Sequence, residues 1–177
     1  VGADSERHGG WLKIISAASD DHDAVLQMSE EWFLPNASKS FYFETRIEST
    51  RASTHGLFIG FTTRDAVLGD AVYTEDHMGF HCKEAASLLA SMDVGSVVSS
   101  VDTGYDLAAN TTVQLAMKYN ATTDTAKWYV DGELTNTLTG ASTYFSAAQL
   151  TFAVKVRNNA GTANTTAIDY VYIEADR

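Results

Sequence analysis

The sequence of 177 residues contains one cysteine, one proline and few basic residues. The single cysteine, Cys82, cannot form an intramolecular disulfide, and a cysteine-based zinc site would lack ligands. Cys82 is therefore expected to be a small buried hydrophobic residue in a strand. No apolar run approaches the roughly 20 residues that a bilayer-spanning helix needs, so no membrane partner is expected. The first residues also lack the basic and apolar regions of a signal peptide, which was either never present or has been removed.

Basic side chains are half as common as acidic ones. Twelve lysine and arginine residues stand against 23 aspartate and glutamate residues, which gives a formal net charge of −11. A surface this negative repels phosphate backbones, so nucleic acid is not an expected partner. It suits solubility, or docking onto a basic surface.

The dominant pattern in the sequence is an alternation of apolar and polar residues with a period of two, which is typical of half-buried strands. Near the start of this pattern, Phe41, Phe43 and Ile47 share one face of a predicted strand. Helix is limited to a turn or two, at 64–70 and 143–149. Strands are predicted at 11–16, 24–28, 40–49, 56–63, 77–82, 87–92, 96–101, 112–120, 125–131, 150–158 and 165–174.

Turn-forming residues separate these runs. The pair Asp131-Gly132, flanked by β-prone residues, predicts a hairpin. Many short strands at this spacing predict an all-β fold, a two-sheet antiparallel β-sandwich of jelly-roll type. We expect one domain at 11–177, preceded by a polar arm at 1–10. The predicted core comprises Phe43, Ile59, Leu115, Trp128, Val130, Phe152 and Val154.

Several of these segments together resemble the concanavalin A-like lectin/glucanase sandwich, which includes laminin-G-like modules. The most specific is the aromatic-Val-Asp-Gly hairpin at 128–132, and the resemblance covers roughly residues 40–177. The order of the segments is also similar to that in virion proteins of tailed bacteriophages. The segments are FYFETRIES (41–49), GLFIGFTT (56–63), HMGFHC (77–82), KWYVDGEL (127–134), FAVKVRN (152–158) and IDYVYIEADR (168–177).

The phage resemblance implies a structural virion protein, a capsid decoration or head-fibre component. Such a protein would assemble in the host cytoplasm and dock at the virion surface on the major capsid protein or other virion subunits. We expect a homo-oligomer, such as a trimer. The alternative is an extracellular, lectin-like adhesion module that binds surface glycans, and a third option is a divergent glycoside hydrolase. The fold accommodates all three.

Catalysis is not expected from Glu44, Arg46 and Glu48, although they share a strand face. Glucanases of the resembled superfamily carry Glu-x-Asp-x-Glu on one strand, and here Arg46 takes the place of the aspartate. An arginine lowers the pKa of neighbouring carboxyls, whereas a general acid needs a raised pKa. Glu44 and Glu48 are also about 13 Å apart along a strand, against about 5–5.5 Å between the carboxyls of a retaining enzyme. No catalytic residue is predicted, and the three should form a solvated charge ladder.

No metal or other cofactor is predicted, but Asp20, Asp21 and Asp23 are candidates for a calcium loop because Ca²⁺ prefers clustered oxygen ligands. Contiguous acids cannot all wrap one ion without help from other loops, which favours a solvated turn. His77 and His81 share a strand face, but their spacing is too long for two ligands of one metal.

A glycan-binding site is not assigned by the sequence. Exposed aromatic rings can stack on sugars, and those near predicted loops are the candidates. They are Trp11, Trp32, Tyr73 and Tyr105.

Overall fold

The computed structural model describes residues 2–3, 10–19, 22–30, 32–50, 55–63, 76–82, 87–95, 97–158, 161 and 163–176. Within them the chain forms thirteen strands and one short 3₁₀ helix, η1. Their bounds are β1 (Gly2–Ala3), β2 (Leu12–Ile15), β3 (His22–Gln27), β4 (Phe41–Ser49), β5 (His55–Thr62), β6 (His77–Cys82), β7 (Ser87–Val94), β8 (Val97–Asp106), β9 (Thr111–Asn120), β10 (Thr125–Val130), β11 (Glu133–Thr139), η1 (Ala141–Tyr144), β12 (Thr151–Asn158) and β13 (Thr165–Ala175).

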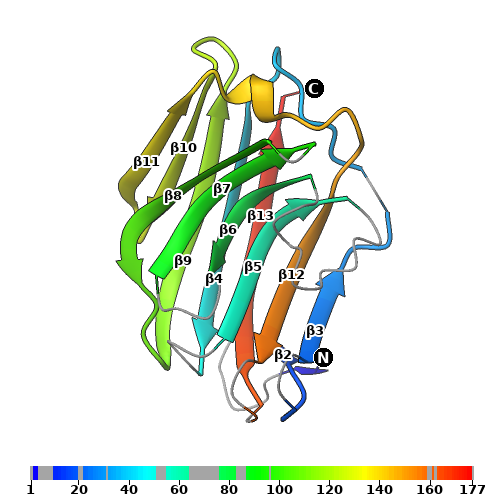
Figure 1. Ribbon diagram of the computed structural model, residues 1–177, viewed down its shortest axis with the longest axis vertical. Coiled ribbons are helices and arrows are strands. Elements are labelled where there is room, and N and C mark those ends of the chain that lie inside the picture. The colour runs from blue at the N-terminus through cyan, green and yellow to red at the C-terminus, as the bar shows by residue number, and fades with distance from the viewer. Residues whose placement is uncertain are drawn as a thin grey trace.

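The strands form two antiparallel sheets that pack face to face (Figure 1). The seven-stranded sheet has the order β1-β2-β13-β4-β9-β10-β11, and the six-stranded sheet has the order β3-β12-β5-β6-β7-β8. This architecture confirms the predicted two-sheet sandwich. Within the described part of the chain, no helix has the length and apolar character needed to cross a membrane.

Each strand expected from the alternation is present, and two further strands were not predicted. The first is β11, whose residues are exposed or half-buried along its length and so lack an apolar face. The second is β1, whose two residues pair with Leu12 and Lys13 of β2, while residues 1 and 4–9 of the predicted arm lie outside the described residues. The helical turn expected at 64–70 also lies outside them, and η1 overlaps the one expected at 143–149 only at its start.

The core lies between the two sheets, and all seven residues predicted for it are buried. Aromatic rings from both sheets meet there, with the ring centroids of Phe43 and Phe61 5.5 Å apart and those of Phe43 and Phe152 5.8 Å apart. Rings in such contacts add about 0.5–1.5 kcal/mol beyond the area that they bury. Cys82 is buried as predicted, and burial raises the pKa of its thiol to about 12.

The hairpin predicted at Asp131-Gly132 joins β10 to β11. Both residues have positive φ, 51° and 80°, as a type I′ turn requires. The turn places Val130 opposite Glu133 and fixes the register of the two strands.

In the centre of the six-stranded sheet, Gly60 of β5 lies directly opposite Gly79 of β6. Their φ angles are 157° and 153°. A Cβ atom added to Gly60 would lie 2.2 Å from the carbonyl oxygen of Met78, and one added to Gly79 would lie 2.3 Å from that of Ile59. The two backbones therefore approach more closely here than any side chain would permit.

Candidate functional site

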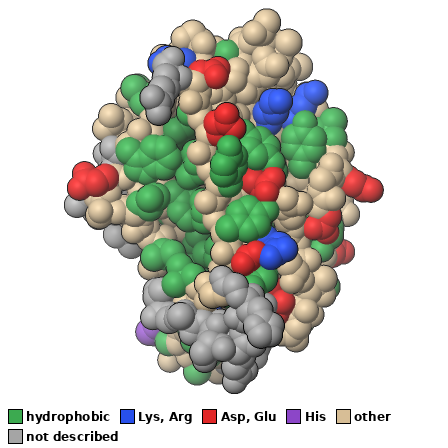
Figure 2. Space-filling view, turned by 180° about the vertical axis from the view of Figure 1, so that it is seen from behind, with side chains coloured by type: hydrophobic (Ala, Val, Ile, Leu, Met, Phe, Trp, Pro, Cys, Tyr) green, Lys and Arg blue, Asp and Glu red, His purple; other side chains and the backbone are tan. Residues whose placement is uncertain are grey.

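Tyrosine side chains collect on the outer face of the seven-stranded sheet. Tyr42 of β4 and Tyr129 of β10 each lie between two buried residues. Tyr170 and Tyr172 of β13 pair with the outward-facing Arg46 and Glu44 of β4. Figure 2 shows hydrophobic side chains spread across the middle of this face, with acidic and basic side chains between them. Tyr172 is 50% exposed. An aromatic surface of this kind, open to solvent, is the strongest candidate for a functional site.

Glu44 is the centre of a hydrogen-bonded network on this face. The hydroxyl groups of Tyr42 and Tyr170 donate to its Oε2 and Oε1 atoms, respectively. Gln114 in turn donates from Nε2 to the Tyr170 hydroxyl at 3.1 Å. Since a carboxylate accepts about four hydrogen bonds, Glu44 keeps capacity for a bond from a ligand.

The same network keeps Glu44 ionised. Partial burial alone would raise the pKa of its carboxyl group, but hydrogen bonds from Tyr170, Tyr42 and Gln114 lower it below its usual value. Burial and the adjacent Glu44 charge raise the pKa of the Tyr42 hydroxyl. The tyrosine therefore remains a hydrogen-bond donor and the glutamate remains an acceptor at physiological pH.

Arg46 is exposed, as expected of a solvated ladder, but it also has partners outside β4. Its guanidinium forms an ion pair with Asp169 and lies 5.6 Å from the ring centroid of Trp11 and 5.8 Å from that of Tyr170. The alternation placed Glu44 and Arg46 on the outer face correctly. The alternation gave no information about their partners. Those of Arg46 come from β13 and from the residue that precedes β2.

A hollow forms on the outer face of the seven-stranded sheet, where a residue with a short side chain is surrounded by residues with long ones. Ala116 of β9 lies in register between Glu44 of β4 and Tyr129 of β10, so it forms a low floor between taller side chains. The hollow has a volume of about 190 Å³, and Gln114 and Lys118 also line it. We call it the Ala116 hollow.

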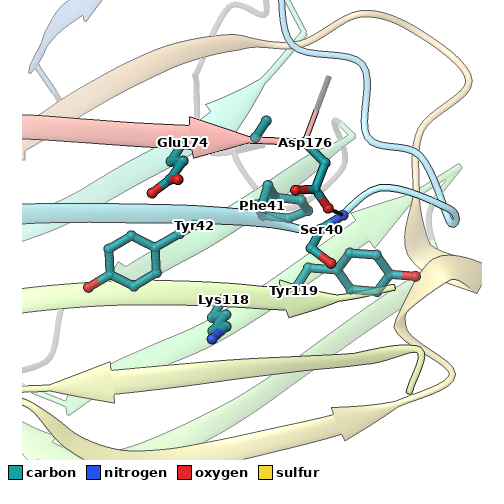
Figure 3. A pocket seen from close by; sticks show the side chains of 8 residues that line it. Ser40, Phe41, Tyr42, Lys118, Tyr119, Glu174 and Asp176 are labelled. Atoms are coloured by element: carbon teal, nitrogen blue, oxygen red, sulfur yellow. Dashed lines mark hydrogen bonds between the residues drawn. The ribbon is translucent and has the colours of Figure 1, made fainter. Parts of the chain in front are cut away.

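A second hollow, of about 300 Å³, adjoins the first and shares Tyr42 and Lys118 with it. Figure 3 shows Glu174, Tyr42 and Lys118 on three neighbouring strands, with Ser40 and Asp176 at one end. The backbone N–H of Ser40 donates to Asp176 Oδ2 at 2.9 Å. We call this the Lys118 hollow.

The aromatic residues proposed from sequence as glycan contacts occupy different environments. Trp32 is 43% exposed. Trp11 is only 7% exposed and Arg46 lies over its ring, so it offers no open stacking surface. Tyr105 is half-buried and packs against the core, while Tyr73 lies outside the described residues.

Of the three calcium candidates, the structure describes only Asp23. Asp20 and Asp21 lie outside the described residues. Asp23 lies on β3, with its Oδ2 atom 3.1 Å from Nζ of Lys155, a lysine that is itself buried. Among the described residues, no group of three or more histidine, cysteine, aspartate or glutamate side chains could hold a metal ion.

The outer face of the six-stranded sheet differs from the tyrosine face because polar side chains on its central strands are buried. His77 Nε2 lies 2.8 Å from Ser91 Oγ, and the ring centroids of His77 and His81 are 6.2 Å apart. Burial, with a further effect of His77, lowers the pKa of His81 to about 3, so its imidazole is neutral at physiological pH. Of the two outer faces, the tyrosine face is the more accessible to a large ligand.

Sequence reasoning missed Tyr42, Tyr129, Tyr172 and Ala116 as site residues. One signal was available, because Tyr42 has the same strand phase as Glu44 and must share its face. The pairing of β9 with both β4 and β10, which creates the Ala116 hollow, is not encoded in any local pattern.

Replacing Glu44 with glutamine is expected to lower the free energy of unfolding by about 0.5–1 kcal/mol at neutral pH, since solvent weakens hydrogen bonds on a half-exposed face. The folded protein holds the pKa of Glu44 below its ordinary value of 4.5. The carboxylate therefore stabilises the fold above that pH, and this contribution is lost as the pH falls through the lower folded pKa. Urea unfolding at neutral and strongly acidic pH should show the Glu44→Gln penalty shrinking in acid. The control is Glu133→Gln, at an exposed position on β11. It should change the free energy of unfolding by less than about 0.5 kcal/mol at both pH values.

No protein-family model matches the sequence, and no curated protein matches it. Solved structures do match the fold. A mutant form of the carbohydrate recognition domain of Emp46p superposes with a TM-score of 0.66 at 13% identity, over 92% of this chain and 87% of that one. This chain has the concanavalin A-like lectin/glucanase fold.

Two further structures with this sandwich illustrate its range. A GH16 protein of a Bacteroides ovatus mixed-linkage glucan locus, in complex with its product, gives a TM-score of 0.66 at 8% identity, over 97% of this chain and 84% of that one. A protein of unknown function from Shewanella oneidensis MR-1 gives a TM-score of 0.63 at 17% identity, over 99% of this chain and 73% of that one. At these identities the likeness establishes the concanavalin A-like fold alone, as the sequence resemblance predicted.

Proposed function

We propose that this protein is a lectin-like module that binds carbohydrate on the outer face of its seven-stranded sheet. The observation that carries the proposal is the Ala116 hollow, an open depression walled by Tyr129 on one side and by the ionised Glu44 on the other. Sugar rings present apolar C–H faces that pack on aromatic rings, and hydroxyl groups that donate to carboxylates. Such a mixture of aromatic walls and a few placed polar groups is typical of small-ligand sites.

The polar groups around the Ala116 hollow match the hydroxyl groups of a sugar. Glu44 offers acceptors, and the Lys118 ammonium and the Gln114 amide offer donors. The tyrosines bring rigid rings with few rotatable bonds, so ordering them on binding costs little conformational entropy. The likeness to a carbohydrate recognition domain and to a glucan-bound GH16 structure is consistent with this assignment.

Filling the Ala116 hollow is expected to weaken binding. A glycan array, screened with and without Ca²⁺, would first identify the ligand, and calorimetry would then compare variants. Ala116→Gln should weaken binding at least about tenfold because its side chain occupies the space of the sugar. Thr137→Gln is the matched control. Thr137 lies on β11, on the same outer face of the sheet as Ala116, but it lines no hollow on this face. Thermal unfolding would verify that both variants are folded.

Two results would count against the carbohydrate assignment: an array without a bound glycan, or undiminished binding by Ala116→Gln. The structural virion role, predicted from the phage resemblance, is the competing proposal. It would gain support if the protein co-sedimented with capsids of its own source while binding no glycan.

A further inference from the structure

A third hollow extends the surface beyond the Lys118 hollow. It has a volume of about 330 Å³ and is lined by Trp32, Leu34 and Lys39, among others. It shares Ser40 and Asp176 with the Lys118 hollow, so the two adjoin. We call it the Trp32 hollow. The three hollows form one continuous series that runs from the β10–β11 turn to the loop after β3.

The exposed ring of Trp32 is held in a fixed orientation. Its centroid lies 6.0 Å from that of Phe33 and 6.3 Å from that of Phe61, in both cases edge to face. The backbone is also anchored, because the N–H groups of Trp32 and Phe33 both donate to the carbonyl oxygen of Leu150. A pre-positioned aromatic ring with 43% of its surface exposed provides a stacking platform at little ordering cost.

Charges of both signs are interspersed along the series. Glu44, Glu174 and Asp176 carry negative charge, while Lys118 and Lys39 carry positive charge between and beside them. A polyanionic chain would meet three carboxylates, and a polycationic chain would meet two ammonium groups. A neutral ligand meets hydrogen-bonding partners along the whole length without repulsion.

We infer that the three hollows together hold an internal stretch of a linear, neutral glycan chain, with Trp32 forming a subsite at one end. This inference rests on the proposed carbohydrate-binding function and adds the length and charge of the ligand. A single terminal sugar would occupy only the Ala116 hollow and would leave the Lys118 and Trp32 hollows unused.

The test uses ladders of cello-, laminari-, manno- and xylo-oligosaccharides, from dimers to hexamers, and calorimetry with the full-length protein. Affinity should rise with chain length until the Trp32 hollow is filled. Trp32→Ala should weaken hexamer binding about tenfold, the usual scale for one aromatic stacking contact, and leave dimer binding unchanged. The control is Val97→Ala, which removes an exposed apolar side chain from the edge strand β8 of the other sheet. It should change neither hexamer binding nor dimer binding.

Each other outcome has a definite meaning. Affinity that is independent of chain length, or equal losses for dimer and hexamer in Trp32→Ala, would overturn the extended-chain inference while leaving carbohydrate binding intact. Tighter binding of polygalacturonate or heparin than of any neutral ladder would overturn the inferred neutrality. If no glycan binds, neutral or charged, the proposed function fails and the inference fails with it.

Discussion

Replacing Trp128 with alanine is expected to lower the free energy of unfolding by about 3–5 kcal/mol. Trp128 is 3% exposed and points into the core from β10, in register with Met117 of β9. Truncation would remove the indole from this site and leave a cavity that the paired strands cannot close by moving. Urea unfolding followed by far-UV circular dichroism would measure the loss.

Two variants test whether the loss comes from packing. Trp128 Nε1 has no hydrogen-bond partner among the described residues, so Trp128→Phe keeps an aromatic ring and removes an unsatisfied donor. Its cost should be well below that of alanine, at about 1–2 kcal/mol. Lys127→Ala, at the adjacent outward-facing position, should cost less than about 0.5 kcal/mol. A cost below about 1 kcal/mol for Trp128→Ala would contradict the inward orientation of this residue.

Gly60→Ala is expected to cost about 3 kcal/mol, combining roughly 1–3 kcal/mol for overpacking with roughly 1–3 kcal/mol for backbone strain. The new methyl group would meet the carbonyl oxygen of Met78 at 2.2 Å, and backbone atoms cannot turn aside as a flexible side chain can. The ladder between β5 and β6 would have to open. Thermal and urea unfolding would both report the change.

Gly104→Ala separates the two contributions. Gly104 also has a positive φ, 72°, but a Cβ atom added there has no neighbour within 4 Å. Its cost should therefore be only the strain of a left-handed residue, about 1 kcal/mol. Equal costs for the Gly60 and Gly104 variants would show that the close approach of the two strands is unimportant for stability.

The strands could be predicted from sequence wherever one face is buried, because burial imposes the period of two. The alternation in 40–49 gave both faces of β4 correctly. β11 escaped prediction because it is an edge strand without a buried face, and its polar residues resemble a loop. Its presence depends on the Asp131-Gly132 turn and on pairing with β10.

The candidate site was harder to predict because distant pairings build it. Tyr170 follows Glu44 by 126 residues, yet its hydroxyl group binds the Glu44 carboxylate. Trp11 was expected near a loop and in the open, but Arg46 covers it. Neither partner of these contacts carries a local signal that identifies the other. The phage-derived expectations of capsid docking and oligomerisation stay predictions.

The position of the last two strands constrains how the molecule is made. β12 lies between β3 and β5 in one sheet, and β13 lies between β2 and β4 in the other. While only the segments before β12 have left the ribosome, β2 and β3 therefore have no neighbouring strand that links them to the rest of their sheets. Completion of both sheets must await the synthesis of β12 and β13, and such distant pairing slows folding. A premature stop before β12 would consequently divide both sheets at once, and the nascent chain would expose unpaired strand edges of the kind that chaperones recognise.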